Sequence, residues 1–366
     1  MRAENLPLRV GQLTGADLRR GAPGGIRSYV LGLSRFLIGR GVSVDMFSNG
    51  PAEELAGGRI RPISPSHVPS AIGFQRALLR WSDPEGFSKI DVLHLHRPDD
   101  ARPLMRRHDV PRLVLTLHGN PALAVRRRRG IVAGSAYRKI EARAMRSFDA
   151  IVAVDEESAR SYADRYPQLA DRIRVIPIAI SDDAGRPSDD PIPRRSNALT
   201  FLFAGRLSVE KRVHEIISAL NSPQLAGARL QIAGSGPEEQ YLRKLSSAAR
   251  VEFLGNVPQE ELWALYQAAD ALVLASEYEG LPTVAVEALS VGCPVVGLPR
   301  CGLDRLVRGG GVIIADDISN LPQAMVRAAE IRRSGKSFSI SSEHRWSRVG
   351  SQILSVYQEL SQEAGA

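Results

Sequence analysis

Short runs of apolar, often β-branched residues recur along the first half of the chain and alternate with helix-like stretches. The strand-like runs are RVGQL (9–13), VSVDMFS (42–48), DVLHLH (91–96), RLVLTLHG (112–119) and DAIVAVD (149–155). After the glycine-rich segment GAPGG (21–25), apolar residues from Ile26 to Leu37 recur at helical spacing. Strands separated by helices predict βαβ units that share a parallel sheet.

The same alternation returns in the second half, in LTFLFAG (199–205), RLQIAG (229–234), ADALVLAS (269–276), CPVVGL (293–298) and VIIAD (312–316). Between the two series, residues 181–197 are rich in Pro, Asp and Ser and have no apolar period, which indicates a linker. The pattern predicts two doubly wound α/β domains, over residues 1–180 and 199–340, and a linker over 181–198. An amphipathic helix within 341–366 is expected to pack back on the first domain.

The composition is that of an ordinary globular protein, with 43% hydrophobic and 24% charged residues. No apolar run approaches the ~20 residues of a membrane span. The N-terminus, MRAENLPLRVGQL, lacks the apolar core of a secretory signal. We therefore expect a cytoplasmic protein in which Cys293 and Cys301, the two cysteines of the sequence, are free thiols.

The net charge of +8 is unevenly distributed between the two halves of the chain. Residues 1–180 hold 29 Lys and Arg against 18 Asp and Glu, whereas the remainder holds 19 against 22. A basic half favours an anionic neighbour: lipid headgroups, a phosphorylated acceptor or nucleic acid. Nucleic acid is disfavoured because aromatic residues make up only 5% of the chain and no recognition motif occurs.

In the segment 124–148, cationic residues are spread along an expected loop and helix. Each cation near an anionic surface contributes ~1 kcal/mol to binding. Our hypothesis is peripheral contact with the inner face of the plasma membrane, where a lipid-linked or phosphorylated acceptor would lie. An arginine-rich surface that is simply solvated is the alternative.

Ligands of doubly wound sheets bind beyond the carboxyl ends of the strands, so the residues that follow each strand carry the most information. In LTFLFAGRLSVEKR a strand ends at Gly205, and Arg206 and Lys211 follow it. Two fixed cations suit a diphosphate, although a solvated loop is the alternative. In QIAGSGPEE, Gly234 and Gly236 form only a G-x-G, a weak signal for which a plain tight turn is the alternative.

A third motif, EYEGLPTVAVE, carries Glu279 and Glu287 eight positions apart after an apolar strand. Pro282 suits the first position of a helix. Thr283 and Val284 would then present amide donors at the helix start, which is an anion site. Because carboxylates accept hydrogen bonds from hydroxyl groups, the two glutamates could grip hydroxyls on either side of a bound phosphate.

These motifs together resemble the retaining GT-B glycosyltransferases of the GT4 family. The resemblance rests on Glu-x7-Glu after an apolar strand, on GRL…EK and GSGPE, and on an N-terminal PGGI loop. It implies two Rossmann-like domains facing a deep cleft. It also implies transfer of a hexosyl group, with retention, from a UDP- or GDP-linked sugar to a hydroxyl acceptor in cell-envelope glycan or glycolipid synthesis. The base, the sugar and the acceptor stay open.

The resemblance assigns roles to single residues. The donor diphosphate would be held by Arg206, Lys211, Thr283 and Val284. Glu287 would bind the ribose, Glu279 would bind the transferred sugar, and His118 would lie near sugar and acceptor. The other residues expected to border the substrates are Gly24, Gly25, Gly205, Gly236, Val257, Gly280 and Leu281. His94 and His96, in the strand LHLH, are interpreted as structural.

No Asp-x-Asp occurs in the chain, which disfavours the metal-dependent GT-A class. Arg206 and Lys211 could replace a divalent metal, so we expect neither a metal nor another cofactor. Two alternatives stay open: a nucleotide-sugar epimerase of the same fold and a basic nucleic-acid-binding protein. The sequence also departs from the family pattern, because the Glu279 loop reads EGLPT and Pro282 removes one amide donor.

Overall fold

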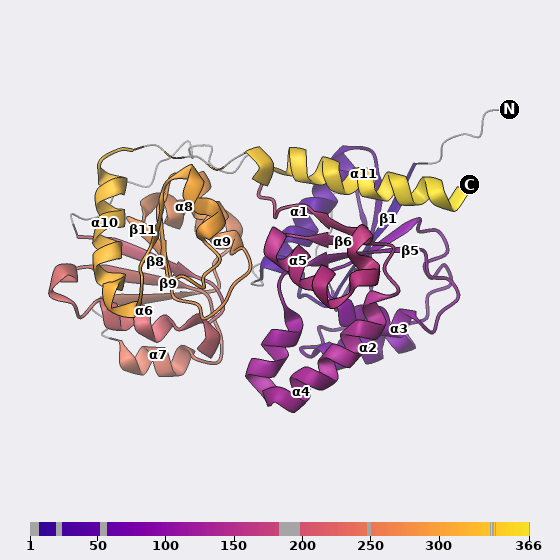
Figure 1. Cartoon of the computed structure of the whole chain (residues 1–366), viewed down its shortest axis with the longest axis horizontal. Helices are drawn as coiled ribbons and strands as arrows, with labels where there is room; N and C mark the ends of the chain where they lie inside the picture. The colour runs from indigo at the N-terminus through magenta and orange to yellow at the C-terminus, as the bar shows by residue number, and fades with distance from the viewer. Residues whose placement is uncertain are drawn as a thin grey trace. The chain divides into compact units, whose positions relative to one another are not determined.

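A computed structural model describes residues 7–19, 24–51, 57–182, 198–246, 250–336, 338, 340 and 342–365. Their contacts form two compact units (Figure 1). The first unit takes the described residues up to 19, Gly25–Ala179 and the C-terminal segment from Arg345. The second takes Gly24 and the described residues from Ile180 to His344. Most of the expected linker, residues 183–197, lies outside the described part of the chain.

The first unit is built on a parallel sheet with the strand order β3-β2-β1-β4-β5-β6-β7. Its strands are β1 Arg9–Thr14, β2 Ser43–Ser48, β3 Arg59–Pro62, β4 Val92–Leu95, β5 Arg112–Leu117, β6 Ala150–Ala153 and β7 Ile173–Val175. The apolar pattern missed β3 and β7, because these edge strands are short and carry charged residues (RIRP and IRV). The other five strands were predicted.

Helices cover both faces of this sheet, because alternate strand residues point to opposite sides. On one face, Leu93 and Leu95 belong to a core cluster with residues of the helices α2 Ala71–Arg80, α3 Ala101–Leu104, α4 Pro121–Met145 and α5 Glu156–Arg165. On the other face, Val92 and Val114 pack with residues of α1 Gly25–Gly39 and α11 Trp346–Gly365.

The second unit repeats the design with the strand order β10-β9-β8-β11-β12-β13. Its strands are β8 Thr200–Ala204, β9 Arg229–Ala233, β10 Val251–Gly255, β11 Ala271–Leu274, β12 Val295–Gly297 and β13 Val312–Ile314. Its helices are α6 Val213–Ala219, α7 Glu239–Leu245, α8 Gln259–Ala268, α9 Thr283–Ser290 and α10 Leu321–Arg333. The pattern missed β10, a partly exposed edge strand, as a separate element.

The C-terminal helix α11 completes the core of the first unit. Figure 1 shows it lying along α1, and the two helices are in contact. Its residues Trp346, Val349, Ile353 and Tyr357 are buried in the cluster that covers the α1 face of the sheet. Among the described residues, no helix is both long and apolar enough to cross a bilayer. Cys293 and Cys301 are buried free thiols, as predicted.

Candidate active site

The strand order of the second unit reverses beside β8, which lies between β9 and β11. Because these strands are parallel, the segments that follow β8 and β11 leave the sheet side by side. Arg206 and Lys211 follow β8, and Glu279 follows β11. The fold therefore brings two of the predicted motifs to one topological switch point, where α/β sheets bind their ligands.

Lys211 and Glu279 meet directly at this edge. The Lys211 Nζ lies 2.8 Å from the Glu279 Oε1, with both side chains partly exposed. The Ser276 hydroxyl donates to the same carboxylate oxygen over 2.6 Å. The backbone also joins the two loops, since the Glu277 amide donates to the Glu210 carbonyl at 2.9 Å. A cation and an oriented carboxylate are thus fixed beside each other.

The Glu279 loop is held from its other side by residues 300–302. The Glu279 amide donates to the Arg300 carbonyl at 3.0 Å. Gly302 has φ +67°, and a Cβ there would lie 1.7 Å from the Gly280 carbonyl oxygen. Only glycine allows this approach, so Gly302 fixes the position of Gly280.

The glycines after β8 and β9 pack against each other. A Cβ at Gly234 would lie 1.9 Å from the Gly205 carbonyl oxygen, and one at Gly236 would lie 2.2 Å from the Leu207 carbonyl oxygen. The Leu207 amide donates to the Ser235 carbonyl over 3.0 Å. Packing of the two loops therefore accounts for both glycines of the G-x-G, which favours the tight-turn interpretation of that motif.

Two further groups after β8 can meet an anion. Arg206 is exposed and forms no ion pair with any described residue. Ser208 is buried, and its hydroxyl oxygen has no hydrogen-bond partner in the described part of the chain. A buried polar atom without a partner is uncommon, and a bound oxyanion would satisfy it.

The start of α9 differs from the prediction in one respect. Pro282 is the N-cap residue rather than the first helical residue, which is Thr283. The amides of Ala285 and Val286 donate to the Pro282 carbonyl. The Thr283 and Val284 amides precede the first helical acceptors, so they remain donors at the positive end of the helix.

Glu287 lies one turn further along α9 and is buried. Its Oε2 accepts a hydrogen bond from the Tyr266 hydroxyl of α8 at 3.0 Å. Burial raises the pKa of this carboxyl to about 7, against the hydrogen bond from Tyr266. A carboxyl with a pKa near 7 is partly protonated at neutral pH. A hydrogen-bond donor that approaches it favours the charged form and lowers its pKa.

The other residues that were expected to border the substrates lie in both units. Gly280, Leu281 and Val257 are half-buried, with the first two between β11 and α9 and Val257 just after β10. Gly24 has φ +140° and open space where a Cβ would stand. Gly25 begins α1 in the first unit, whereas Gly24 groups with the second.

His118 follows β5 in the first unit and is half-buried. Its Nε2 lies 3.2 Å from the Nδ1 of His96, and the Tyr29 ring meets its ring edge-on at a centroid distance of 4.8 Å. Burial lowers the pKa of His118 to about 4, so the ring is neutral at physiological pH. His94 and His96 are buried, which agrees with their structural interpretation.

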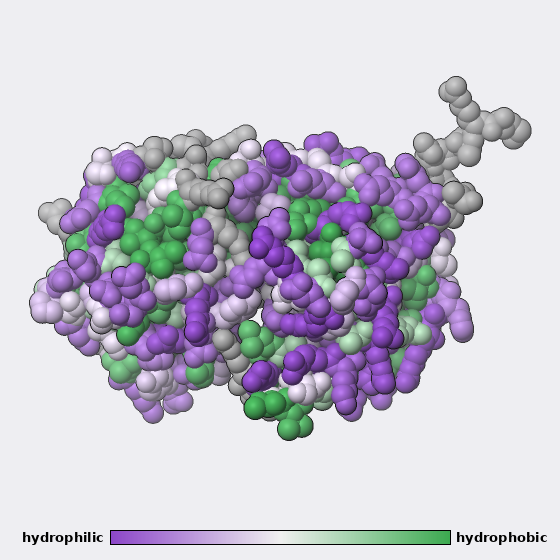
Figure 2. All heavy atoms as spheres, viewed as in Figure 1, coloured by the Kyte–Doolittle hydropathy of each residue, from purple (hydrophilic) through white to green (hydrophobic). Residues whose placement is uncertain are grey.

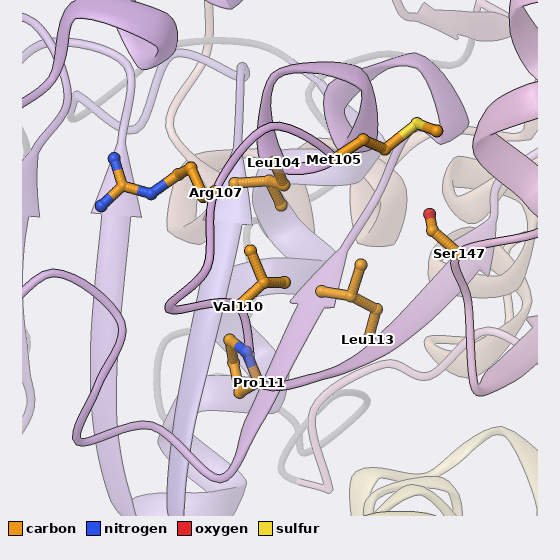
Figure 3. Close-up of a pocket in the computed structure, with 7 residues that line it drawn as sticks. All are labelled: Leu104, Met105, Arg107, Val110, Pro111, Leu113 and Ser147. Carbon is orange, nitrogen blue, oxygen red and sulfur yellow. The ribbon is translucent and has the colours of Figure 1, made fainter.

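A pocket of about 180 Å³ lies elsewhere, at the amino end of β5 (Figure 3). Its lining residues are Leu104, Met105, Arg107, Val110, Pro111, Leu113 and Ser147. None of them is a candidate site residue, and the amino end of a strand is the edge opposite the expected ligand sites. We assign the pocket no role in the chemistry.

Sequence reasoning missed the residues that support the charged groups. Ser276 orients Glu279, Tyr266 bonds Glu287, and Gly302 fixes the Gly280 loop. The one available signal was glycine itself, since Gly302 opens the turn CGLD after a buried strand. Ser276 and Tyr266 carried no local pattern, because their roles depend on contacts between separate elements.

Comparison with known proteins identifies the family of this chain. Residues 187–331 match the family "Glycosyl transferases group 1", and residues 23–184 match "Glycosyltransferase Family 4". The chain is 30% identical to glycogen synthase of Mycobacterium tuberculosis, with 91% of each chain covered. It is 29% identical to D-inositol 3-phosphate glycosyltransferase of Geodermatophilus obscurus, over 94% of this chain and 87% of that one.

Among solved structures, Anabaena Alr3699/HepE in complex with UDP-glucose superposes with a TM-score of 0.69. The two chains are 18% identical, and the match covers 98% of this chain and 99% of HepE. At that identity the likeness shows the fold, which is two parallel sheets covered by helices. The protein therefore belongs to the family 4, group 1 glycosyltransferases and has the GT-B fold.

Proposed function

We propose that this glycosyltransferase moves a hexosyl group from a UDP- or GDP-linked sugar to a hydroxyl acceptor, with retention of configuration. The observation that carries the proposal is the Lys211–Glu279 pair at the switch point of the second sheet, next to the start of α9. This arrangement combines a cation and amide donors, which suit a diphosphate, with a carboxylate, which suits the hydroxyl groups of a sugar.

The chemical demand is to ionise the bond between the sugar C1 and the leaving diphosphate oxygen. Lys211, Arg206 and the first amides of α9 stabilise the negative charge that develops on the diphosphate. The sugar passes through an oxocarbenium-like transition state. The acceptor hydroxyl attacks from the face that the diphosphate leaves, and the leaving phosphate takes its proton.

Glu279 has two partners in turn under this proposal. Without a ligand it pairs with Lys211. When the diphosphate binds, Lys211 turns toward the phosphate charge, and the Glu279 carboxylate accepts hydrogen bonds from sugar hydroxyls. Because these side chains neutralise the diphosphate, we propose that the reaction proceeds without a divalent metal or another cofactor.

Two relatives support the choice of substrates. The HepE structure is a complex with UDP-glucose, which supports a nucleotide sugar as the donor. The name of the Geodermatophilus relative specifies an inositol phosphate, which supports a phosphorylated acceptor. The basic first half of this chain fits either a phosphorylated or a lipid-linked acceptor.

We also propose that the protein works on the inner face of the plasma membrane, in envelope glycan or glycolipid synthesis. The support comes from α4, which kinks at Gly130 (φ 84°, ψ 175°) and leaves Ile131 65% and Val132 84% exposed. Figure 2 shows a hydrophobic patch among hydrophilic atoms where Figure 1 draws the bend of α4. Glu141, the one acid of residues 121–147, is fully buried.

A thermal-unfolding panel tests the donor site. UDP, GDP and ADP, and UDP-glucose and GDP-mannose, are each added in the presence of EDTA. At a ligand concentration of 100 Kd, one nucleotide class should stabilise the protein by ~2.7 kcal/mol. The double variant Arg206→Glu/Lys211→Glu should lose this shift.

The matched control is Arg229→Glu, an exposed cation at the amino end of β9 in the same unit, which should keep the shift. Absence of stabilisation by every nucleotide, or an undiminished shift in the double variant, would refute the proposal. Formation of an epimer from a nucleotide sugar alone would support the epimerase alternative instead.

A further inference from the structure

Buried polar side chains form a connected row on the α1 and α11 face of the first sheet. Gln12 on β1, His94 on β4 and Thr116 on β5 occupy the same alternation as the valines of that face and are fully buried. The register pairs Gln12 with His94. Tyr357 of α11 enters the row and is fully buried as well.

The row begins at His118. The His118 Nε2 lies 3.2 Å from the His96 Nδ1, and the His96 Nε2 lies 2.9 Å from the Gln12 Oε1. The Gln12 amide nitrogen donates to the Tyr357 hydroxyl at 3.4 Å. The Tyr357 hydroxyl also bonds the Nδ1 of His94, whose Nε2 lies 2.7 Å from the Thr116 hydroxyl.

The contacts from Gln12 through His96 to His118 have one consistent direction. The Gln12 Oε1 can only accept, so the His96 Nε2 must carry the hydrogen. A neutral imidazole has one N–H, which leaves the His96 Nδ1 as an acceptor. The His118 Nε2 must therefore donate to it, and the His118 Nδ1 is left as the bare nitrogen.

Neutrality of the imidazoles follows from their surroundings. Burial lowers the pKa of His94 to about 3 and that of His118 to about 4, and lowers the pKa of His96 well below its usual range. The three rings lie close together, with the His94 and His96 centroids 4.6 Å apart, so a charge on one disfavours a charge on the next.

We infer that Gln12, His96 and Tyr357 are positioning residues that hold His118 in its Nε2–H tautomer, so that its Nδ1 accepts a hydrogen bond from a hydroxyl of the sugar or of the acceptor. The inference rests on the proposed function, which brings substrate to His118. It makes His118 an orienting acceptor that gains no proton during transfer, since the acceptor proton leaves with the phosphate. Fixing one tautomer through a second partner is how buried imidazoles are oriented in proteins.

The first test needs no substrate. Full-length protein labelled with ¹⁵N-histidine is compared with a His118→Gln sample, which identifies the His118 ring nitrogens. Ring-nitrogen shifts distinguish an N–H from a bare nitrogen, and we expect Nε2–H and bare Nδ1 between pH 6 and 8. An Nδ1–H tautomer, or protonation of the ring in that range, overturns the inference without affecting the donor proposal.

The second test breaks the row at its centre. Gln12→Met keeps the length of the side chain but removes the acceptor for the His96 N–H. We expect mixed tautomers at His118 and a fall of about five- to ten-fold in kcat, equivalent to the loss of one hydrogen bond. The rate measured is that of nucleoside diphosphate release from UDP-glucose or GDP-mannose, whichever the unfolding panel selects. KM for that donor should not change.

Tyr29→Phe is the matched control. It removes only a 3.5 Å contact with Thr116 at the far end of the row and keeps the aromatic edge against His118. In this variant the His118 tautomer and kcat should equal those of the native protein. Equal tautomer populations in Gln12→Met and native protein, or a change in donor KM without a change in kcat, would overturn the inference. Failure of every nucleotide to bind would instead refute the proposed function.

Discussion

At the scale of single residues, Glu287 is a buried acid of α9. Its carboxyl is buried, bonded to Tyr266, and has a pKa raised to about 7. The ordinary value for this group is 4.5, so the folded protein holds the proton more tightly than the unfolded chain. The contribution of this carboxyl to the free energy of unfolding is therefore complete below pH ~4.5 and is lost as pH rises through about 7.

We predict that nucleoside diphosphate binding releases a proton from Glu287. Ribose hydroxyls donate to the carboxylate and lower its pKa, so affinity should rise up to about tenfold per pH unit below 7 and level off above. Calorimetric titration at pH 6 in two buffers of different ionisation enthalpy measures the protons released. The phosphate itself titrates near pH 6, so the comparison is with Glu287→Gln.

Glu287→Gln should release fewer protons than the native protein and bind more weakly above pH 7. The stability of the native protein relative to this variant should also fall by roughly 3 kcal/mol between pH 5 and 8. Equal proton release in both proteins would contradict the role of Glu287, whichever nucleotide is used.

At the scale of elements, the site is an assembly of loops held by close backbone contacts. The Gly205 loop packs on Gly234, and the Gly280 loop packs on Gly302. The short helical turn that contains Glu210 and Lys211 is bonded to the Glu279 loop through the Glu277 amide. The candidate cations are thus positioned by the segment that follows β8, and the candidate carboxylate Glu279 by the segment that follows β11.

We predict that Gly302→Ala is much more damaging than Gly227→Ala. Both glycines have a left-handed φ, +67° and +78°, but only at Gly302 would a Cβ strike another backbone, at Gly280. Gly227→Ala should cost ~1 kcal/mol for its conformation alone. Gly302→Ala should cost about 1–3 kcal/mol more and weaken nucleotide binding. Urea unfolding of both variants measures the difference, and equal losses would show that the Gly280 loop adapts freely.

The sequence predicted the elements of the site better than its contacts. Long apolar runs predicted β1, β5 and β8 because buried parallel strands have a continuous apolar pattern. Arg206, Lys211 and Glu279 were chosen as candidates because they follow such strands. The row that begins at His118 could not be predicted, because its members His118 and Tyr357 are 239 positions apart in sequence and belong to one row only through packing of α11.

At the scale of the whole molecule, charge separates the two halves of the chain. Part of the positive charge of the first half lies on α4, where Arg126, Arg138, Lys139 and Arg143 are exposed. The apolar pair Ile131 and Val132 lies between them in sequence, at the kink of the same helix. Exposed apolar residues gain free energy when they enter a bilayer, and the cations that flank them are attracted to anionic lipid headgroups.

We predict that the protein floats with vesicles containing 30% phosphatidylglycerol and not with pure phosphatidylcholine vesicles. Ile131→Asp/Val132→Asp should reduce binding at least tenfold, because it removes apolar contact and adds charges that the surface repels. Ile72→Asp, at an exposed apolar residue of α2, is the control and should bind normally. Equal binding to both vesicle types, or none, would remove the membrane proposal.

The helix α11 packs in the core of the first unit, against α1 and beside the His118 row. Domains usually fold in the order in which the ribosome makes them. Here the second unit can finish first, while the first unit must wait until α11 has been synthesised. A chain that ended before α11 would carry a complete second unit and a first unit without the helix that covers one face of its sheet.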